Sequence, residues 1–310
     1  MRVTLIHNPG AGDDKRPSKG QLEALIREAG HDVRYQSVRE KGWSKVLKKA
    51  ADLIAVAGGD GTVGKVARRQ IGRGIPIAIL PMGTANNISR TLGIADLSVI
   101  QLIPSWSTAR HLSWDAGVSE GPWGERTFIE GIGVGLLTTA IPHIDANETV
   151  AQLNDAEVKL TYTVQLLREQ LDDCPPTRLN VKLDGKDASG DYILFETLLM
   201  EYIGPNLYLA PKIVRDDGLF DVVMVAEEDR AELHEHLKTW QDGMLWPAEF
   251  KTQQAKRVEI EWTGFPVHID DKLWPPKGKR KPKQPAPIDL RVVRKAVDFL
   301  VPKDLPDRPR

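Results

Sequence analysis

The sequence predicts an α/β N-terminal domain with a mostly parallel sheet, followed by a second domain that is mainly antiparallel β. In roughly the first hundred residues, short apolar runs alternate with helical patterns, which is the order of a parallel sheet covered by helices. After Leu112, apolar and polar residues alternate as they do in antiparallel strands. The chain has 310 residues, which is long for one compact core and sufficient for two.

The elements of the first domain follow in order along the chain. We expect strands at VTLIH, DVRYQSV, DLIAVAG and IPIAIL, and helices near SKGQLEALIREAG, near WSKVLKKAA, after Gly61 and from Thr84 to about Leu92. Sheets of this kind bind ligands outside the carboxyl ends of their strands.

The second domain is predicted from strands at HLSWDAGVS, RTFIEGIGVG, RLNVKLDG, YILFETLLMEYIG, LFDVVMVA, RVEIEWTG and PVHID. One long amphipathic helix, from about Asn147 to Leu171, interrupts them, and its apolar stripe favours a core position. The predicted domains are therefore residues 1–112 and 113–287. The last apolar strand, within 288–310, could return to the first domain.

Composition excludes several classes of protein. The chain is 41% hydrophobic and 27% charged, with a formal net charge of −1, so it has no global attraction to nucleic acid or to a membrane. The one cysteine, Cys174, cannot form an internal disulfide, which favours a reducing cytoplasm. The N-terminus enters a β-branched run directly, so we expect a strand there and not a signal peptide. The longest apolar stretch, Phe128 to Pro142, is shorter than the roughly 20 residues that span a bilayer.

Three glycine-rich turns fall at the carboxyl edge of the predicted parallel sheet. They are NPGAG after the first strand, GGDGT after the third and PMGTANN after the fourth. Glycines let backbone N–H groups approach an anion, and the helix that begins at each turn adds a positive dipole end. The convergence predicts a phosphate site. It is not a P-loop, because Val66 stands where that motif needs a hydroxyl for its magnesium ion.

These motifs resemble those of the diacylglycerol kinase catalytic family of bacterial lipid kinases, which are related to sphingosine kinases and more remotely to NAD kinases. The resemblance covers nearly the whole chain and rests on Asn8-Pro9-Gly10-Ala11-Gly12, Gly58-Gly59-Asp60-Gly61-Thr62, Pro81-Met82-Gly83-Thr84-Ala85-Asn86-Asn87, and Ala210-Pro211 followed by Asp217-Gly218-Leu219-Phe220-Asp221. It implies an NAD kinase/diacylglycerol kinase-like fold. It also implies an enzyme that transfers the γ-phosphate of ATP to a lipid hydroxyl, with diacylglycerol as the first expected acceptor.

The resemblance further implies that ATP and Mg²⁺ are the cofactors, with ATP on the first domain and the lipid on the second. The implied nucleotide-binding residues are Asn8, Pro9, Gly58, Gly59, Asp60, Gly61, Thr62, Gly83, Thr84 and Asn86. Asp60 is also a candidate catalytic residue that orients magnesium-bound phosphate; the alternative is a cap of the following helix. Lys65 lies one turn into that helix, where a solvated charge is expected.

A structural magnesium ion is implied at the Asp-Gly element of the second domain. Its ligands would be the carboxylate of Asp217 and the carbonyls of Val214 and Leu219, since hard cations prefer oxygen ligands. The alternative is an ordinary Asp-Gly turn.

The catalytic base is where the chain departs from the family pattern. The family carries Asp-Gly-Glu, whose glutamate is taken as the base for the lipid hydroxyl, whereas here the residues are Asp270, Asp271 and Lys272. A lysine is ordinarily protonated near pH 7 and cannot accept a proton. We expect Asp270 or Asp271 to replace the base, and strand parity, which places Asp270 with His268, favours Asp270. The alternative for both is a solvated strand terminus.

Other functions and partners stay open. The lysine at position 272 is consistent with a non-catalytic nucleotide-binding regulator, and a sphingoid base or NAD is an alternative acceptor. A lipid headgroup is expected in the cleft between the domains. Residues 277–283 carry five Lys or Arg, which indicate either a docking segment for anionic headgroups at the inner face of the membrane or a solvated linker. No nucleic-acid partner is expected, and the oligomeric state is left open.

Overall fold

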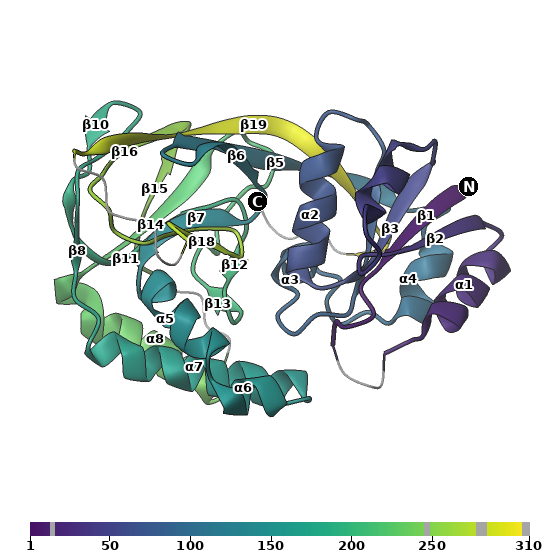
Figure 1. Cartoon of the computed structure of the whole chain (residues 1–310), viewed down its shortest axis with the longest axis horizontal. Coiled ribbons are helices and arrows are strands. Elements are labelled where there is room, and N and C mark those ends of the chain that lie inside the picture. Colours follow the sequence, from purple (N-terminus) through teal and green to yellow (C-terminus); the bar gives the residue numbers. More distant parts are fainter. Residues whose placement is uncertain (13–15, 245–248, 277–283, 306–310) are drawn as a thin grey trace. The chain divides into compact units, whose positions relative to one another are not determined.

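The computed structural model describes residues 1–12, 16–244, 249–276 and 284–305 (Figure 1). The chain divides into two compact units. The N-terminal unit contains Met1–Trp114, the short segment Asn154–Ala156 and the C-terminal segment from Lys295. The β-rich unit contains Asp115–Leu153 and Glu157–Arg294.

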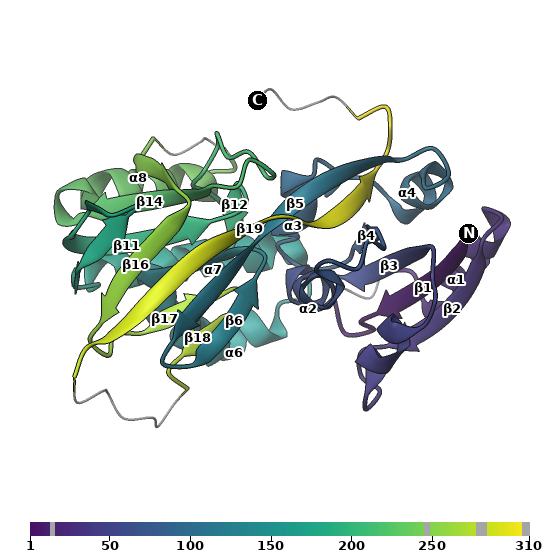
Figure 2. The same cartoon turned by 90° about the horizontal axis from the view of Figure 1, so that it is seen from above.

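A parallel sheet forms the centre of the N-terminal unit. Its strands are β1 (Arg2–His7), β2 (Asp32–Ser37), β3 (Leu53–Gly58) and β4 (Ile77–Pro81), which lie side by side in the order β4-β3-β1-β2 (Figure 2). The end of β19 (Ala286–Val301) adds to it, because Phe299 and Leu300 pair in parallel with β4. Every residue of β3 and β4 is buried, as expected for strands covered on both faces.

The helices of the N-terminal unit are α1 (Lys19–Glu28), the 3₁₀ helix η1 (Trp43–Lys48), α2 (Asp60–Gln70), α3 (Asn87–Thr91) and α4 (Val99–Ser105). The helix predicted from Thr84 begins only at Asn87, because Asn86 has a left-handed backbone with φ of 54°. The Asn86 side chain closes the loop by accepting from the N–H of Gly83 at 2.8 Å and donating to its carbonyl at 2.9 Å. An asparagine tolerates this backbone better than most residues.

Two antiparallel layers form the β-rich unit. One is a sheet in the order β15-β14-β11-β7-β17-β18, with β8 beside β11. Its strands are β7 (Gly131–Gly135), β8 (Thr177–Leu179), β11 (Gly190–Leu198), β14 (Phe220–Ala226), β15 (Lys251–Ala255), β17 (Val267–Ile269) and β18 (Lys272–Trp274). The other contains β9 (Val181–Leu183), β10 (Lys186–Asp187), β16 (Arg257–Trp262) and β19, with the hairpin of β5 (Arg110–Gly121) and β6 (Gly124–Phe128). A short hairpin joins β12 (Tyr202–Ile203) to β13 (Leu207–Tyr208).

The core of the β-rich unit contains apolar side chains from both layers, including Phe195, Phe220, Trp262 and Leu290. All four side chains are buried, as expected for the inner faces of two packed sheets. The predicted antiparallel second domain is confirmed.

The helices of the β-rich unit differ from the prediction. The structure has α5 (Leu136–Asp145), α6 (Glu148–Gln152), α7 (Ala156–Asp172), the 3₁₀ helix η2 (Glu227–Asp229) and α8 (Arg230–Gln241), and Figure 1 shows α5, α7 and α8 together on one side of the unit. The single helix predicted from Asn147 is wrong, because Leu153 is extended and separates α6 from α7. Helix α8, which was not predicted from the sequence, buries Leu233 and Leu237 one turn apart.

Among the described residues, no helix has both the length and the apolar character needed to cross a membrane. Residues 277–283, predicted to be either a docking segment for anionic headgroups or a solvated linker, lie outside the described residues.

Candidate functional site

Three loops meet at the carboxyl edge of the parallel sheet. They follow β1, β3 and β4, which are neighbours in the sheet, so their carboxyl ends lie together. Asn8 connects two of them: its N–H donates to the carbonyl of Ala57 at 2.9 Å, and its Nδ2 donates to Thr62 Oγ1 at 3.3 Å. The same asparagine closes its own loop by accepting from the N–H of Gly10 at 3.2 Å.

Direct backbone contact explains the glycines of these loops. A Cβ added at Gly83 would lie 2.4 Å from the Cα of Gly59, and one added at Gly59 would lie 2.8 Å from the Cα of Gly83. At Gly12 a Cβ would lie 2.4 Å from the carbonyl oxygen of Met82. Gly59 is also the N-cap of α2, so the cap residue has no side chain that could occupy the positive end of that helix.

Asp60 ties the loop after β3 to the loop after β4. Its Oδ2 accepts from the N–H of Asn87, and its Oδ1 accepts from the N–H of Ile88, both at 2.9 Å. The carboxylate therefore caps α3, whereas the sequence analysis considered a cap of α2. Burial raises the pKa of Asp60, and the backbone hydrogen bonds oppose that rise. A carboxylate has about four lone-pair sites. A magnesium ion would be oriented by the lone pairs of Asp60 that do not accept from the N–H groups of α3.

The remaining predicted nucleotide residues line the same edge. Thr62 is buried, Thr84 and Gly61 are half-buried, and Pro9 is exposed. A Cβ on Gly58 would lie 3.0 Å from the Thr62 side chain, so the glycine gives that side chain room. Lys65 is exposed on α2, which confirms its predicted solvated position.

Two arginines beside the loops were missed by the sequence analysis. Arg39 follows β2 and lies against the first loop: a Cβ on Gly10 would be 2.4 Å from its Nη2. No ion pair of Arg39 is found among the described residues. Arg16 donates from Nη1 to the carbonyl of Pro81 at 3.2 Å. The available signal for Arg39 was its place two residues past Ser37, the last residue of a strand in this sheet. Guanidinium groups bind phosphate oxygens well.

The Asp-Gly element of the β-rich unit forms a tight turn. Asp217 Oδ1 accepts from the N–H of Leu219 at 2.9 Å, and Asp115 accepts from the N–H of Gly218 at 2.7 Å. Burial, together with the charge on Asp217, raises the pKa of Asp221 to about 6 against a hydrogen bond from Gln254. Within the described part of the chain, Asp221 Oδ2 has no hydrogen-bond partner, and no group of three or more His, Cys, Asp or Glu is arranged to hold a metal.

The turn between β17 and β18 contains the candidate bases. Ile269 pairs with Lys272, so Asp270 and Asp271 are the two loop residues of a hairpin, and Asp270 has φ of 48°. Strand parity therefore does not apply to them. Asp271 and Lys272 form an ion pair at 2.9 Å, with side chains that are 35% and 71% exposed.

Asp270 points into the protein instead. Only 6% of it is exposed, and its Oδ1 accepts from the N–H groups of Ile129 at 3.1 Å, Glu130 at 2.9 Å and Gly131 at 3.4 Å. Its own N–H donates to the carbonyl of Gly131 at 2.8 Å. These bonds hold the chain between β6 and β7, where the sequence analysis expected one continuous strand.

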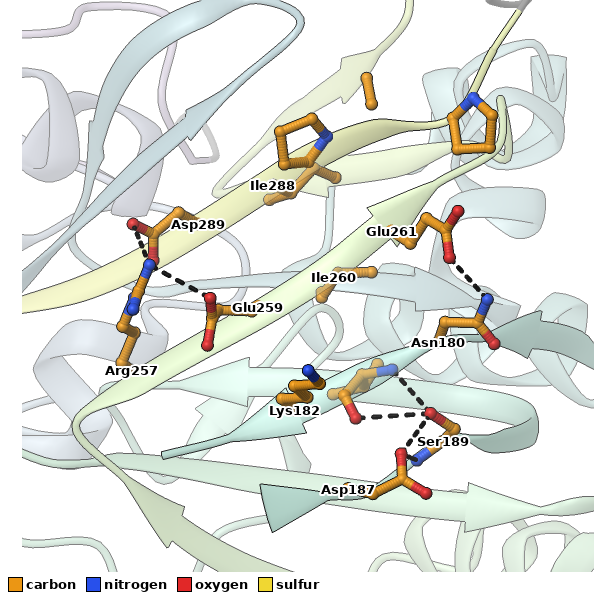
Figure 3. Close-up of a pocket in the computed structure, with 14 residues that line it drawn as sticks. Asn180, Lys182, Asp187, Ser189, Arg257, Glu259, Ile260, Glu261, Ile288 and Asp289 are labelled. Atoms are coloured by element: carbon orange, nitrogen blue, oxygen red, sulfur yellow. Dashed lines mark hydrogen bonds and ion pairs between the residues drawn. The ribbon is translucent and has the colours of Figure 1, made fainter. Parts of the chain in front are cut away.

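A groove of about 460 Å³ on the β-rich unit carries none of the predicted site residues (Figure 3). It lies on the polar face of β9, β16 and β19. Arg257 bonds to Asp289 at 2.8 Å and pairs with Glu259 at 3.1 Å, and Asn180 donates to Glu261 at 2.7 Å. Such cross-strand pairs are typical of a solvated sheet face.

Comparisons with known proteins identify two family matches along the chain. Residues 2–116 match the family described as diacylglycerol kinase catalytic domain, and residues 143–299 match the YegS C-terminal NAD kinase beta sandwich-like domain. A diacylglycerol kinase of Bacillus subtilis is 26% identical over 239 residues, which are 74% of this chain and 76% of that protein. A diacylglycerol kinase of Mycobacterium tuberculosis is 24% identical over 318 aligned positions, covering 97% of this chain and 96% of that protein.

The solved structures bear on the fold. The crystal structure of a diacylglycerol kinase from Bacillus anthracis superposes with a TM-score of 0.72 at 19% identity, covering 98% of both chains. The predicted fold class is confirmed by this likeness and by the two sheets. The second family match alone spans more than half of the sequence. The chain therefore belongs to the diacylglycerol kinase family.

Proposed function

We propose that this protein is an ATP-dependent kinase that transfers the γ-phosphate of ATP to the hydroxyl of diacylglycerol. The observation that carries the proposal is the convergence of three glycine loops at one sheet edge, with Gly59 against Gly83 and the glycine N-cap of α2 beside them. Relatives that are named diacylglycerol kinase, across several bacteria, support the choice of acceptor.

The nucleotide would be held by the backbone of the loops. Backbone N–H groups and the α2 dipole suit phosphate oxygens. Arg39, against Gly10, would add a positive charge. Phosphoryl transfer depends mainly on such positioning and charge neutralisation. A magnesium ion bound with ATP would neutralise charge on the β- and γ-phosphates.

Asp271 is the better of the two candidate proton acceptors. Asp270 is buried and already accepts three backbone N–H groups, whereas the Asp271 side chain is 35% exposed and contacts only the exposed Lys272 among the ion pairs of the described residues. The lipid hydroxyl proton would pass to a carboxylate oxygen of Asp271 while the hydroxyl oxygen bonds to the γ-phosphorus. The bond between that phosphorus and the bridging oxygen breaks, and ADP leaves.

A structural magnesium ion at Asp217 is a separate part of the proposal. One oxygen of Asp217 accepts from Leu219, which leaves the other for a cation together with the carbonyls of Val214 and Leu219. The unpartnered oxygen of Asp221 adds negative charge to the same turn.

The experiment is phosphate transfer from radiolabelled ATP in mixed micelles that contain diacylglycerol, with sphingosine and NAD in parallel reactions. We expect label in phosphorylated diacylglycerol, near-complete loss of it in Asp60→Ala, and wild-type rates in Lys65→Ala, a control on the exposed face of the same helix. If the label appears in sphingosine or NAD instead, that acceptor is the substrate and diacylglycerol is not.

One observation favours a second candidate, a nucleotide-binding regulator. Lys272 occupies the position at which the family pattern has its base, and it is paired with Asp271. Tight ATP binding without transfer to any of the three acceptors would favour the regulator over the kinase.

A further inference from the structure

A buried ion pair crosses the middle of the sheet of the β-rich unit. His268 on β17 and Glu196 on β11 are 2% and 0% exposed, and His268 Nε2 lies 2.8 Å from Glu196 Oε2. The strand β7 separates them, and its Gly133 is in register with both residues. A Cβ on Gly133 would lie 2.1 Å from Glu196 Oε2, so the pair can meet only because that position has no side chain.

The other nitrogen of the His268 ring contacts the turn between β17 and β18, which contains Asp270 and Asp271. Nδ1 lies 3.1 Å from the carbonyl oxygen of Asp270. A carbonyl oxygen can only accept, so Nδ1 carries a proton and donates it. Nε2 faces an acidic side chain, so the ring is protonated at both nitrogens when Glu196 is ionised. Burial lowers the pKa of His268, but the charge of Glu196 and the hydrogen bonds more than offset this, and the pKa is raised.

Asp270 is therefore held at each of its polar groups. Its carbonyl accepts from His268, its N–H donates to Gly131, and its carboxylate accepts from the 129–131 segment. The next residue, Asp271, is partly exposed. Fixing Asp270 thus fixes the backbone from which Asp271 projects.

We infer that the Glu196–His268 pair is a positioning device that holds the Asp270 carbonyl and thereby sets the position of the Asp271 carboxylate. The inference rests on the proposed function in one respect, the role of Asp271 as proton acceptor. His268 contacts neither substrate nor nucleotide in this role and acts only through the turn.

Two substitutions of His268 distinguish the proposed positioning role from a general contribution of the ring to packing. Asparagine places an amide N–H near the position of Nδ1 and can keep the bond to Asp270, whereas glutamine places one near Nε2 and keeps only the bond to Glu196. Both remove the ring. We expect His268→Gln to lower kcat by about 10²-fold, the cost of a misplacement of about 1 Å, while His268→Asn keeps most of the activity. Nucleotide affinity should be unchanged in both, because the glycine loops belong to the other unit.

A second mutation tests whether the effect passes through Asp271. If it does, His268→Gln should have little further effect on kcat in an Asp271→Asn background, since coupled residues are not additive. Hydrogen exchange at the amides of Asp270 to Lys272 gives a readout that does not require activity. Exchange should rise in His268→Gln and stay near the wild-type rate in His268→Asn.

Equal losses of kcat and equal exchange rates in the two His268 variants would overturn the inference, because both variants would then show only the effect of removing the imidazole ring. If the wild type transfers phosphate to no lipid, the proposed function fails, and the exchange rates alone decide whether the pair fixes the turn. If a variant does not fold, nitrogen NMR of the wild type still tests the inference, because it shows whether Nδ1 of His268 carries a proton. A His268 ring without a proton on Nδ1 would contradict the bond to Asp270.

Discussion

Gly83→Ala should weaken nucleotide binding for steric reasons alone. Gly83 does not have a positive φ, so alanine brings no backbone strain of its own. Its Cβ, however, would lie 2.4 Å from the Cα of Gly59 and 2.9 Å from Asn86 Oδ1. The first of these neighbours is backbone and cannot rotate away.

The size of the effect follows from the overlap. Ordinary contact begins at 3.4 Å, so the two loops must separate by the difference between 3.4 and 2.4, about 1 Å. A displacement of about 1 Å can cost about 10²-fold in rate. Overpacking also costs about 1–3 kcal/mol of folding free energy. Losing one hydrogen bond to a charged phosphate, about 1.5–3 kcal/mol, would weaken nucleotide affinity by about 10- to 100-fold.

Titration calorimetry with ATP and magnesium measures the affinity, and thermal unfolding of the same samples measures stability. Gly20→Ala is the matched control, because nothing lies within 4 Å of a Cβ at that position of α1. The control should bind like the wild type. Wild-type affinity and melting temperature in Gly83→Ala would refute the argument that the two glycines are required by loop contact.

Three further predictions concern the β-rich unit. Asp271→Asn should lower kcat for lipid phosphorylation by about 10²–10⁴-fold with unchanged nucleotide affinity, and an unchanged kcat would reject Asp271 as acceptor. Magnesium chloride without nucleotide should raise the melting temperature of the wild type but not of Asp217→Ala; an equal rise would place the ion elsewhere. Burial lowers the pKa of His236 from 6.5 to about 4, so the unfolded chain binds this proton more readily. As pH falls from 6.5 toward 4, the wild type should lose up to about 3 kcal/mol relative to His236→Leu in urea unfolding, whereas a constant difference would contradict the assignment.

The sequence by itself was sufficient for the parallel sheet and for the loops at its edge. β3 and β4 are short apolar runs that are buried at every residue, and such runs, alternating with helical patterns, have few other arrangements. The glycine motifs were also readable, because each follows a strand directly and the carboxyl ends of neighbouring parallel strands share one edge. Local pattern was less reliable for helix ends, as the break at Leu153 shows.

Only the tertiary structure decided what the site side chains contact. Asp60 caps a helix that begins 27 residues later, and Asp270 accepts from N–H groups about 140 residues earlier in the chain. His268 and Glu196 are 72 residues apart and meet only because of the register of their strands on β7. Periodicity reports which face of a strand is buried, but the partner across the sheet depends on strand order and register, and these are set by packing of the whole unit.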